Sequence, residues 1–138
     1  MVYTFSLAIQ DLIKQVKGKE ELFVREFTKD LSTVLIKNTP VDTGRMISAW
    51  WPSVDVPMEG PEVMMSGADR SGAPSIARVM AVTPTIAAGQ TYYIINGQYY
   101  AKWVEHGTTR ISPRLFARRV VAMAPAIASS TAAKVRRR

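Results

Sequence analysis

Apolar residues recur at helical spacing in the first third of the chain. Between Lys19 and Lys37 the charged side chains lie mostly away from a single apolar stripe, which is the pattern of an amphipathic helix packed on a core. Pro40 follows soon after, and proline disfavours helical backbone at the residue before it. The pattern therefore predicts a long helix over 19–37 whose stripe faces the core: Phe23, Phe27, Leu31, Val34 and Leu35.

A shorter segment precedes this helix. The alternation of Phe5, Leu7 and Ile9 fits a strand. Ser6 is also a candidate N-cap, and apolar residues at helical spacing after it predict instead a first helix ending near Gly18: Ile9, Leu12, Ile13 and Val16. Both interpretations stay open at this point.

The segment after Pro40 combines strand and loop signals. Residues 46–56, MISAWWPSVDV, predict a brief helical turn that runs into a strand, and Pro52 and Pro57 place that strand at a sheet edge or a bend. Residues 57–75 are rich in Gly, Pro and Ser, so they predict a long loop. Loops of this length usually bind something or become ordered on assembly.

The third quarter of the chain predicts a second strand. Residues 75–82, SIARVMAV, fit a short helix or a strand. The next apolar run, QTYYIIN, is rich in tyrosine and isoleucine and predicts a strand closed by the turn signal Asn96-Gly97. The residues after Gly97, QYYAKWVEHG, fit the return strand of a hairpin or a short helix. We favour the helix, because its apolar residues share a face and Gly107 suits a C-cap.

A last helix begins at Ser112-Pro113, an N-cap followed by proline at the first helical position. Pro125 is expected to kink or end this helix, leaving a basic tail at 126–138. The order of elements predicts one α+β domain over 1–138, with a small antiparallel or mixed sheet packed against a long N-terminal helix and a C-terminal helix.

Composition excludes several kinds of chemistry. The 138 residues include no cysteine, which removes thiol catalysis, disulfides and thiolate zinc sites. A single histidine, His106, argues against a histidine metal site within one chain. The longest run without charge, between Arg78 and Lys102, contains proline and several polar residues, so no membrane span is expected. The N-terminus has no basic region typical of a signal peptide, and the protein is expected to be soluble and unexported.

Positive charge is concentrated in the last quarter of the chain. Up to Glu105 there are 10 basic and 11 acidic residues, giving −1, whereas 8 basic residues and no acids follow it, which accounts for the net charge of +7. Such a segment suits an acidic partner surface or nucleic acid. A solvated terminus explains it equally well.

The tripeptide Asp42-Thr43-Gly44 is also the signature of aspartic proteases, which need two such aspartates sharing a proton. Only one copy is present, so a protease would have to be a dimer. The charged Arg45 beside the tripeptide would perturb that dyad. We favour a structural corner in which Pro40 ends the helix, Asp42 accepts backbone N–H bonds, Gly44 adopts a positive φ, and Arg45 closes onto Asp42 or a neighbouring carboxylate.

Other candidate groups carry weaker signals. Glu105 and His106 form an acid–base pair on paper, but adjacent residues diverge on a helix. Five aromatic residues fit a stacking platform for single-stranded nucleic acid, although core or interface packing is the favoured use: Tyr92, Tyr93, Tyr99, Tyr100 and Trp103. The sequence predicts no catalytic residue, no metal site and no cofactor.

Three segments together resemble one protein family: NTPVDTGRMISAW, YYIINGQYYAKWVEHGTT and SPRLFARRV, in this order behind a long helix. They are similar to the minor tail or tail-completion proteins of tailed bacteriophages, the neck family related to the phage lambda Z protein. The likeness spans residues 22–121. It implies a non-enzymatic virion protein, made in the host cytoplasm, that joins or completes the head–tail junction as one of several copies in a ring.

The resemblance also implies partners. These are other neck and tail proteins, namely a connector or adaptor, a tail terminator or a tail tube, together with further copies of this chain and DNA in the channel. The remaining alternatives are a small basic DNA-binding protein and the dimeric aspartic protease. Eleven residues are candidates for contact with partners: Tyr99, Tyr100, Trp103, Glu105, Gly107, Arg114, Arg118, Arg119, Arg136, Arg137 and Arg138.

Overall fold

The computed structural model describes residues 16, 18–59, 67–98, 101–107 and 115–138, without the side chains of Lys102 and Trp103. Its elements are, in chain order, α2 (Glu20–Lys37), β1 (Trp50–Val54), α4 (Ala73–Val82), the 3₁₀ helix η1 (Thr83–Thr85), β2 (Tyr92–Asn96), α5 (Ala101–His106) and α6 (Phe116–Arg136). No helix in these ranges is long and apolar enough to cross a membrane.

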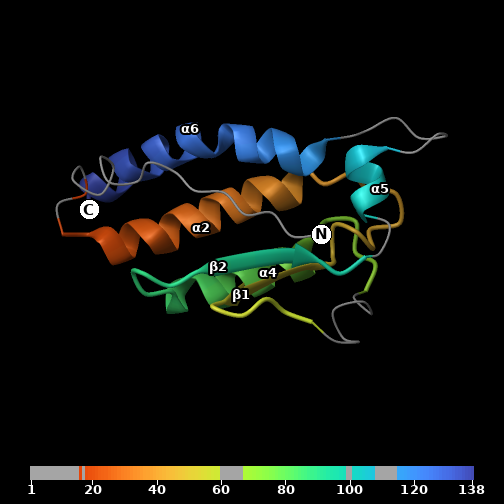
Figure 1. The fold of residues 1–138 in the computed structure, drawn as a ribbon, viewed down its shortest axis with the longest axis horizontal. Coiled ribbons are helices and arrows are strands. Elements are labelled where there is room, and N and C mark those ends of the chain that lie inside the picture. The colour runs from red at the N-terminus through yellow and green to blue at the C-terminus, as the bar shows by residue number, and fades with distance from the viewer. Residues whose placement is uncertain (1–15, 17, 60–66, 99–100, 108–114) are drawn as a thin grey trace.

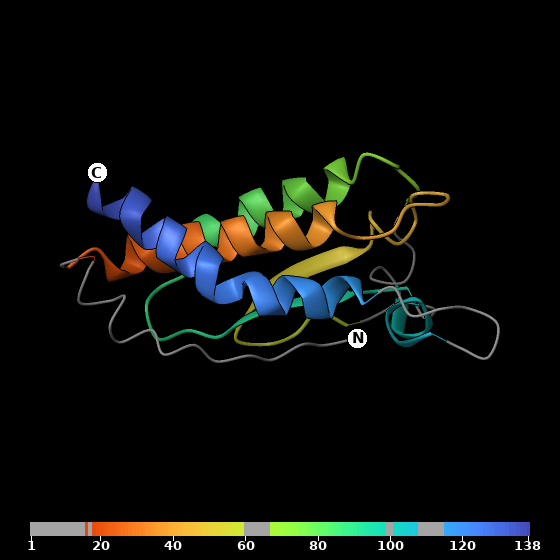
Figure 2. The ribbon, with the colours of Figure 1, turned by 90° about the horizontal axis from the view of Figure 1, so that it is seen from above.

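The elements form an α+β arrangement. Figure 1 shows α2 and α6 side by side and running in opposite directions, with the sheet on the other side of α2 from α6. Figure 2, seen from above, shows α4 flanking α2 on the side away from α6. Helix α4 also packs on β1. This confirms the predicted fold class of a small sheet held against a long N-terminal and a C-terminal helix.

Within the part of the chain that the structure describes, the sheet consists of two antiparallel strands. The register runs from Trp50 opposite Asn96 to Val54 opposite Tyr92. Each strand of a two-stranded sheet is an edge strand, which is why Pro52 is tolerated opposite Ile94 although it lacks a backbone donor. Both strands and the edge position were correctly predicted.

Helix α2 contributes large residues to its contact with α6, and α6 contributes mainly small ones. Phe23 and Phe27 of α2 stack with ring centroids 5.7 Å apart. Four buried residues of α6 complete this core cluster, spaced so that they share one face: Ala124, Ala128, Ala132 and Val135. The alanines allow α6 to approach the phenylalanine rings closely.

A second core cluster joins the remaining elements near the other end of α2. It combines Ile36 of α2, Trp50 of β1, Val79 of α4, Ala101 of α5 and Phe116 of α6, all at most 2% exposed. Trp50 meets the Phe116 ring edge to face, at a centroid distance of 6.2 Å. Trp50 thus joins strand β1 to helix α6.

The expected basic tail at 126–138 is wrong, because α6 continues through Pro125 to Arg136. Figure 2 shows the axis of α6 changing direction midway along the helix, so the expected kink is confirmed and the expected end is not. Burial of Ala128, Ala132 and Val135 against α2 holds the second half of the helix in place.

Three other predicted boundaries either differ from the structure or lie outside the described residues. Helix α6 begins at Phe116, with Leu115 as a left-handed N-cap at φ +49°, whereas Ser112-Pro113 lies outside the described residues. The predicted loop 57–75 ends earlier, since α4 starts at Ala73, and its residues 60–66 are not described. Most of the predicted first helix also lies outside the described ranges.

Candidate functional site at the Pro40–Arg45 corner

The corner Pro40–Arg45 connects α2 to β1, and its backbone conformation depends on Gly44. Gly44 has φ +93°, a value that residues with a side chain rarely adopt. The backbone N–H of Arg45 donates to the Thr43 hydroxyl at 3.3 Å, and the chain then makes one helical turn in which Ser48 N–H donates to the Gly44 carbonyl at 3.1 Å. The predicted positive φ and brief helical turn are confirmed.

A second segment, Asp69–Gly72, clamps the corner from outside. The Ser48 hydroxyl donates to the Asp69 carbonyl at 2.8 Å and accepts from the Asp69 N–H at 3.0 Å. The Arg70 Nε donates to the backbone carbonyl of Asp42 at 2.8 Å. A Cβ on Gly44 would lie 2.6 Å from the Arg70 nitrogen, so the two backbones pass too closely for any side chain.

The corner presents its polar side chains outward. Asp42, Thr43 and Arg45 are exposed. Within the described residues the Asp42 carboxylate has no hydrogen bond and Arg45 has no ion pair. The expectations that Asp42 accepts backbone N–H bonds and that Arg45 closes onto Asp42 or a neighbouring carboxylate are therefore wrong. The turn is held by the backbone carbonyl of Asp42 instead. A hollow of about 450 Å³ lies beside these residues, lined by the corner together with Met46 and Val104.

Buried hydroxyls fix the first strand below the corner. The Trp50 indole N–H donates to the Thr39 hydroxyl at 2.9 Å, and that hydroxyl donates to the Leu35 carbonyl at 2.9 Å. The Trp50 backbone N–H donates to the Ser75 hydroxyl at 3.1 Å, which donates to the Ile47 carbonyl at 2.7 Å. These roles of Thr39 and Ser75 have no signal in the sequence pattern.

Arg78 joins α4 to the same strand and was not singled out from the sequence. Its Nη1 donates to the carbonyls of Ser48 and Trp50 at 2.9 and 2.8 Å. Its guanidinium lies 3.9 Å from the centroid of the Trp51 ring, a cation–π contact. Burial lowers the pKa of the Arg78 guanidinium.

The Asn96-Gly97 pair does not form a hairpin turn. The Asn96 side-chain amide donates to the Met46 carbonyl at 2.8 Å, and the Gly97 N–H donates to the Ala49 carbonyl at 2.9 Å. These bonds attach the end of β2 to the corner and direct the chain into α5. The preferred short helix is confirmed as α5, and Gly107 after it has φ +78° as expected for a C-cap.

Glu105 is completely buried, so its proposed role in partner contact is wrong. Both carboxylate oxygens accept from the Ala117 N–H at 3.1 Å, and Oε1 also accepts from the Arg118 N–H at 3.3 Å. The N–H of Leu115 donates to the Glu105 carbonyl at 3.1 Å. Glu105 therefore caps the start of α6, where unpaired N–H groups and the helix dipole favour a negative charge.

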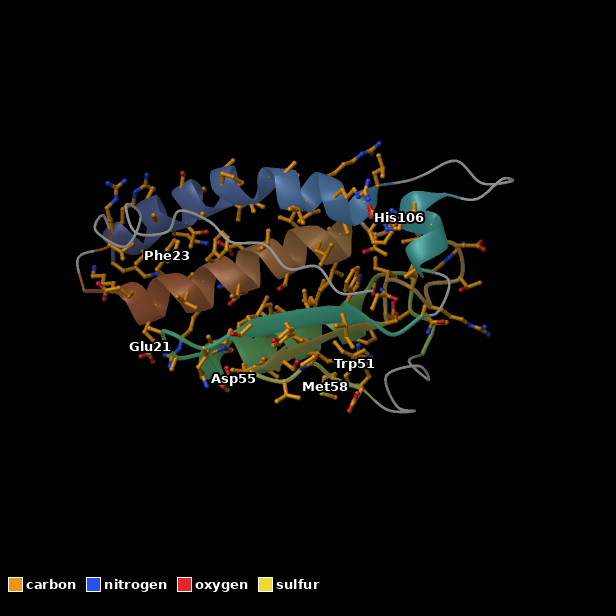
Figure 3. The ribbon with its side chains drawn as sticks, in the orientation of Figure 1. Glu21, Phe23, Trp51, Asp55, Met58 and His106 are labelled. Carbon is orange, nitrogen blue, oxygen red and sulfur yellow. The ribbon has the colours of Figure 1, made fainter. Side chains whose placement is uncertain are left out.

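Of the other candidate contact residues, Arg118 and Arg119 are exposed near the start of α6, and Gly107 is half-buried. Figure 3 shows the exposed His106 on α5 beside this end of α6. Trp103 lies on α5, but its side chain is not described. Tyr99, Tyr100 and Arg114 are outside the described residues.

The basic residues at the end of α6 divide into two groups. Arg136 and Arg137 are exposed. Arg138 pairs with Glu26 at 3.2 Å and Lys134 pairs with Asp30 at 2.9 Å, which ties the end of the chain to α2. Partial burial opposes ionisation of Glu26, but the Lys29 and Arg138 cations beside it outweigh this and lower its pKa.

The corner is exposed, and hydrogen bonds to its backbone hold its conformation. Its one carboxylate is exposed, whereas a protease dyad shares a proton between two shielded carboxylates. No group of three or more histidine, aspartate or glutamate side chains lies close enough to hold a metal in the described part of the chain. No family model, no curated protein and no solved structure matches this chain.

Proposed function

We propose that this chain is a structural protein of a tailed bacteriophage particle, a neck or tail-completion component that joins or seals the head–tail junction as one copy in a ring. One observation carries the proposal. The three segments that resemble the family contribute Met46 and Trp50, then Ala101, then Phe116 and its neighbours to a single core cluster. Their order and spacing therefore serve one structural unit.

Among the described residues, the polar groups of these segments have structural roles, and no set of them is arranged as a catalytic site. Glu105 caps the start of α6, and Asn96 attaches the end of β2 to the corner. Gly44 allows the corner to pass close to the backbone of Arg70. The clamped corner is exposed. Its Val41 is 46% exposed and lies close in sequence to the charged and exposed Asp42 and Arg45. Such a mixed surface beside a hollow suits docking to a connector or adaptor, a tail terminator or a tail tube.

Exposed arginines on α6 support an additional contact with DNA in the channel. Arg118, Arg119, Arg136 and Arg137 are available for phosphates. We favour this role over that of a dedicated DNA-binding protein, because Lys134 and Arg138 already pair with acids of α2. Binding dominated by these arginines would weaken steeply as salt is raised.

The test is to remove the chain from the phage that encodes it. We expect full heads and complete tails that stay separate and that join when the purified chain is added. Normally joined particles without the chain would refute the proposal. Asp42→Asn is the discriminating variant: it should still restore joining, whereas the protease alternative requires a peptide-cleaving activity that this substitution abolishes while the fold is kept.

A further inference from the structure

A groove on the helical face of the molecule is lined by two exposed methionines. It has a volume of about 560 Å³, and α2 forms its floor between α4 and α6. Met80 on α4 is 47% exposed and Met123 on α6 is 44% exposed. Val34 and Ile127 continue this apolar lining, and the charged Lys29 and Asp30 of α2 lie at its edge. Unbranched methionines adapt their shape to an incoming group, which is why they are common at binding surfaces. We call the four apolar residues the methionine groove.

A protruding apolar segment lies at the end of β1. Asp55 has φ +67°, and this unusual backbone is held by three bonds: its N–H donates to the Thr91 carbonyl at 2.7 Å, and its carboxylate accepts from the Thr91 N–H and the Gln90 side chain at 3.1 Å each. The fixed turn presents Val56, which is 70% exposed. We call Asp55–Met58 the β1 knob.

The two surfaces are complementary and face different ways. Figure 3 shows Asp55 and Met58 on the sheet side, opposite α6. Residues 50–59 carry two acids, Asp55 and Glu59, and no base. Helix α6 and its end carry only basic charges. Lys134 and Arg138 already pair with acids of α2, and the basic residues that remain for a partner are Arg118, Arg119, Arg136 and Arg137. Unlike surfaces on opposite sides of one chain are what a head-to-tail contact between identical subunits requires.

We propose that the methionine groove binds the β1 knob of a second copy of this chain, with Val56 inserted between Met80 and Met123. This deepens the proposed function, on which it rests, by naming the contact that repeats around the ring. Because the two surfaces differ, an open assembly has one free groove at one end and one free knob at the other until it closes into a ring. A symmetric dimer cannot satisfy this arrangement with one contact.

Disulfide trapping tests the contact directly, because the natural chain contains no cysteine. In the full-length purified chain carrying both Val56→Cys and Met123→Cys, oxidation should give a ladder of covalent oligomers that reductant collapses. Each single variant alone should stay uncrosslinked, and an equal mixture of the two should stop at dimers. Val41→Cys with Met123→Cys is the matched control, since Val41 is also an exposed valine, 46% against 70% for Val56, but lies at the corner. This pair should give no ladder.

A second measurement follows association without cysteines. Val56→Asp should weaken self-association about tenfold or more in sedimentation velocity, because it places a charge in an apolar groove, while circular dichroism stays unchanged. The proposal is overturned if the control pair forms the same ladder, if either single variant dimerises as well as the mixture, or if the chain stays monomeric up to about 1 mM.

The outcomes separate the two proposals. A ladder from the purified chain, together with normally joined particles in its absence, would refute the virion role and leave the contact standing. Heads and tails that fail to join without the chain, together with no ladder from its purified oligomers, would refute this contact and leave the role standing.

Discussion

Replacing Glu105 with glutamine tests whether a buried carboxylate holds the start of α6. The carboxylate is fully buried, and it accepts two bonds from the Ala117 N–H and one from the Arg118 N–H. Glutamine has nearly the same volume, so packing is preserved. It has only one acceptor oxygen and no charge, and its amide group would direct hydrogens at backbone donors.

The expected loss follows from these contacts. Hydrogen bonds to a charged group contribute about 1.5–3 kcal/mol each, and a buried charge at a helix terminus adds up to about 2 kcal/mol, part of which is offset by the cost of burying the charge. We expect Glu105→Gln to lower the free energy of unfolding by about 2 kcal/mol. Glu105→Ala also leaves a cavity and an unpaired N–H, so about 3–5 kcal/mol is expected.

Urea unfolding followed by far-UV circular dichroism measures both values. The control is Glu21→Gln in the first turn of α2, where the exposed carboxylate pairs with Arg25 and its loss should cost less than about 0.5 kcal/mol. A Glu105→Gln chain that unfolds within about 0.5 kcal/mol of the natural one would refute the capping role.

Two further predictions concern the corner and a buried hydroxyl. Gly44→Ala should destabilise the chain by more than Gly89→Ala, because Gly89 has a similar φ of +89° but no atom within 4 Å of the added Cβ. The backbone strain of a side chain at positive φ costs about 1–2 kcal/mol at either position. Equal losses of stability in the two variants would contradict the close approach of Gly44 to Arg70. Burial raises the pKa of Tyr92 to about 12, although its bond to Ser32 opposes this. Tyr92 therefore contributes stability that is complete below pH 10, its unfolded pKa, and is lost toward pH 12. At pH 11 the free energy of unfolding of the natural chain should have fallen by about 1.4 kcal/mol more than that of Tyr92→Phe. Urea unfolding at several pH values measures both, and the same pH dependence in the two chains would refute this.

Local patterns in the sequence predicted the elements whose causes are local. The apolar stripe of α2, the tyrosine- and isoleucine-rich β2 and the C-cap at Gly107 each depend on residues within a few positions of one another. In the second half of α6 two local signals oppose each other: Pro125 predicts an end to the helix, whereas the alanine spacing predicts that it continues. Ala124, Ala128 and Ala132 recur every four residues, and that regularity was a usable signal.

The parts of the site that could not be predicted depend on distant partners. The cap formed by Glu105 requires α5 and α6 to meet at one angle, and neither segment encodes that angle alone. Ser48 bonds to Asp69 across 21 positions, and Arg78 reaches Trp50 across 28. The role predicted for Asp42 was wrong for the same reason: Arg70, near the end of the long loop, donates to the backbone oxygen of Asp42.

If the corner contacts a partner as we propose, the clamp links the stability of the chain to that contact. Binding costs the entropy of ordering the surface that binds, so a surface that is already fixed keeps more of its contact energy. The corner is fixed by Gly44, Ser48 and Arg70, whose bonds point inward or along the backbone, while Asp42 and Arg45 keep their side chains in solvent. Substitutions at the clamp should therefore weaken assembly without removing any group that touches the partner. Reversing the charge at Asp42 or Arg45 should weaken it without changing the stability of the chain, whereas the conservative Asp42→Asn should still allow joining.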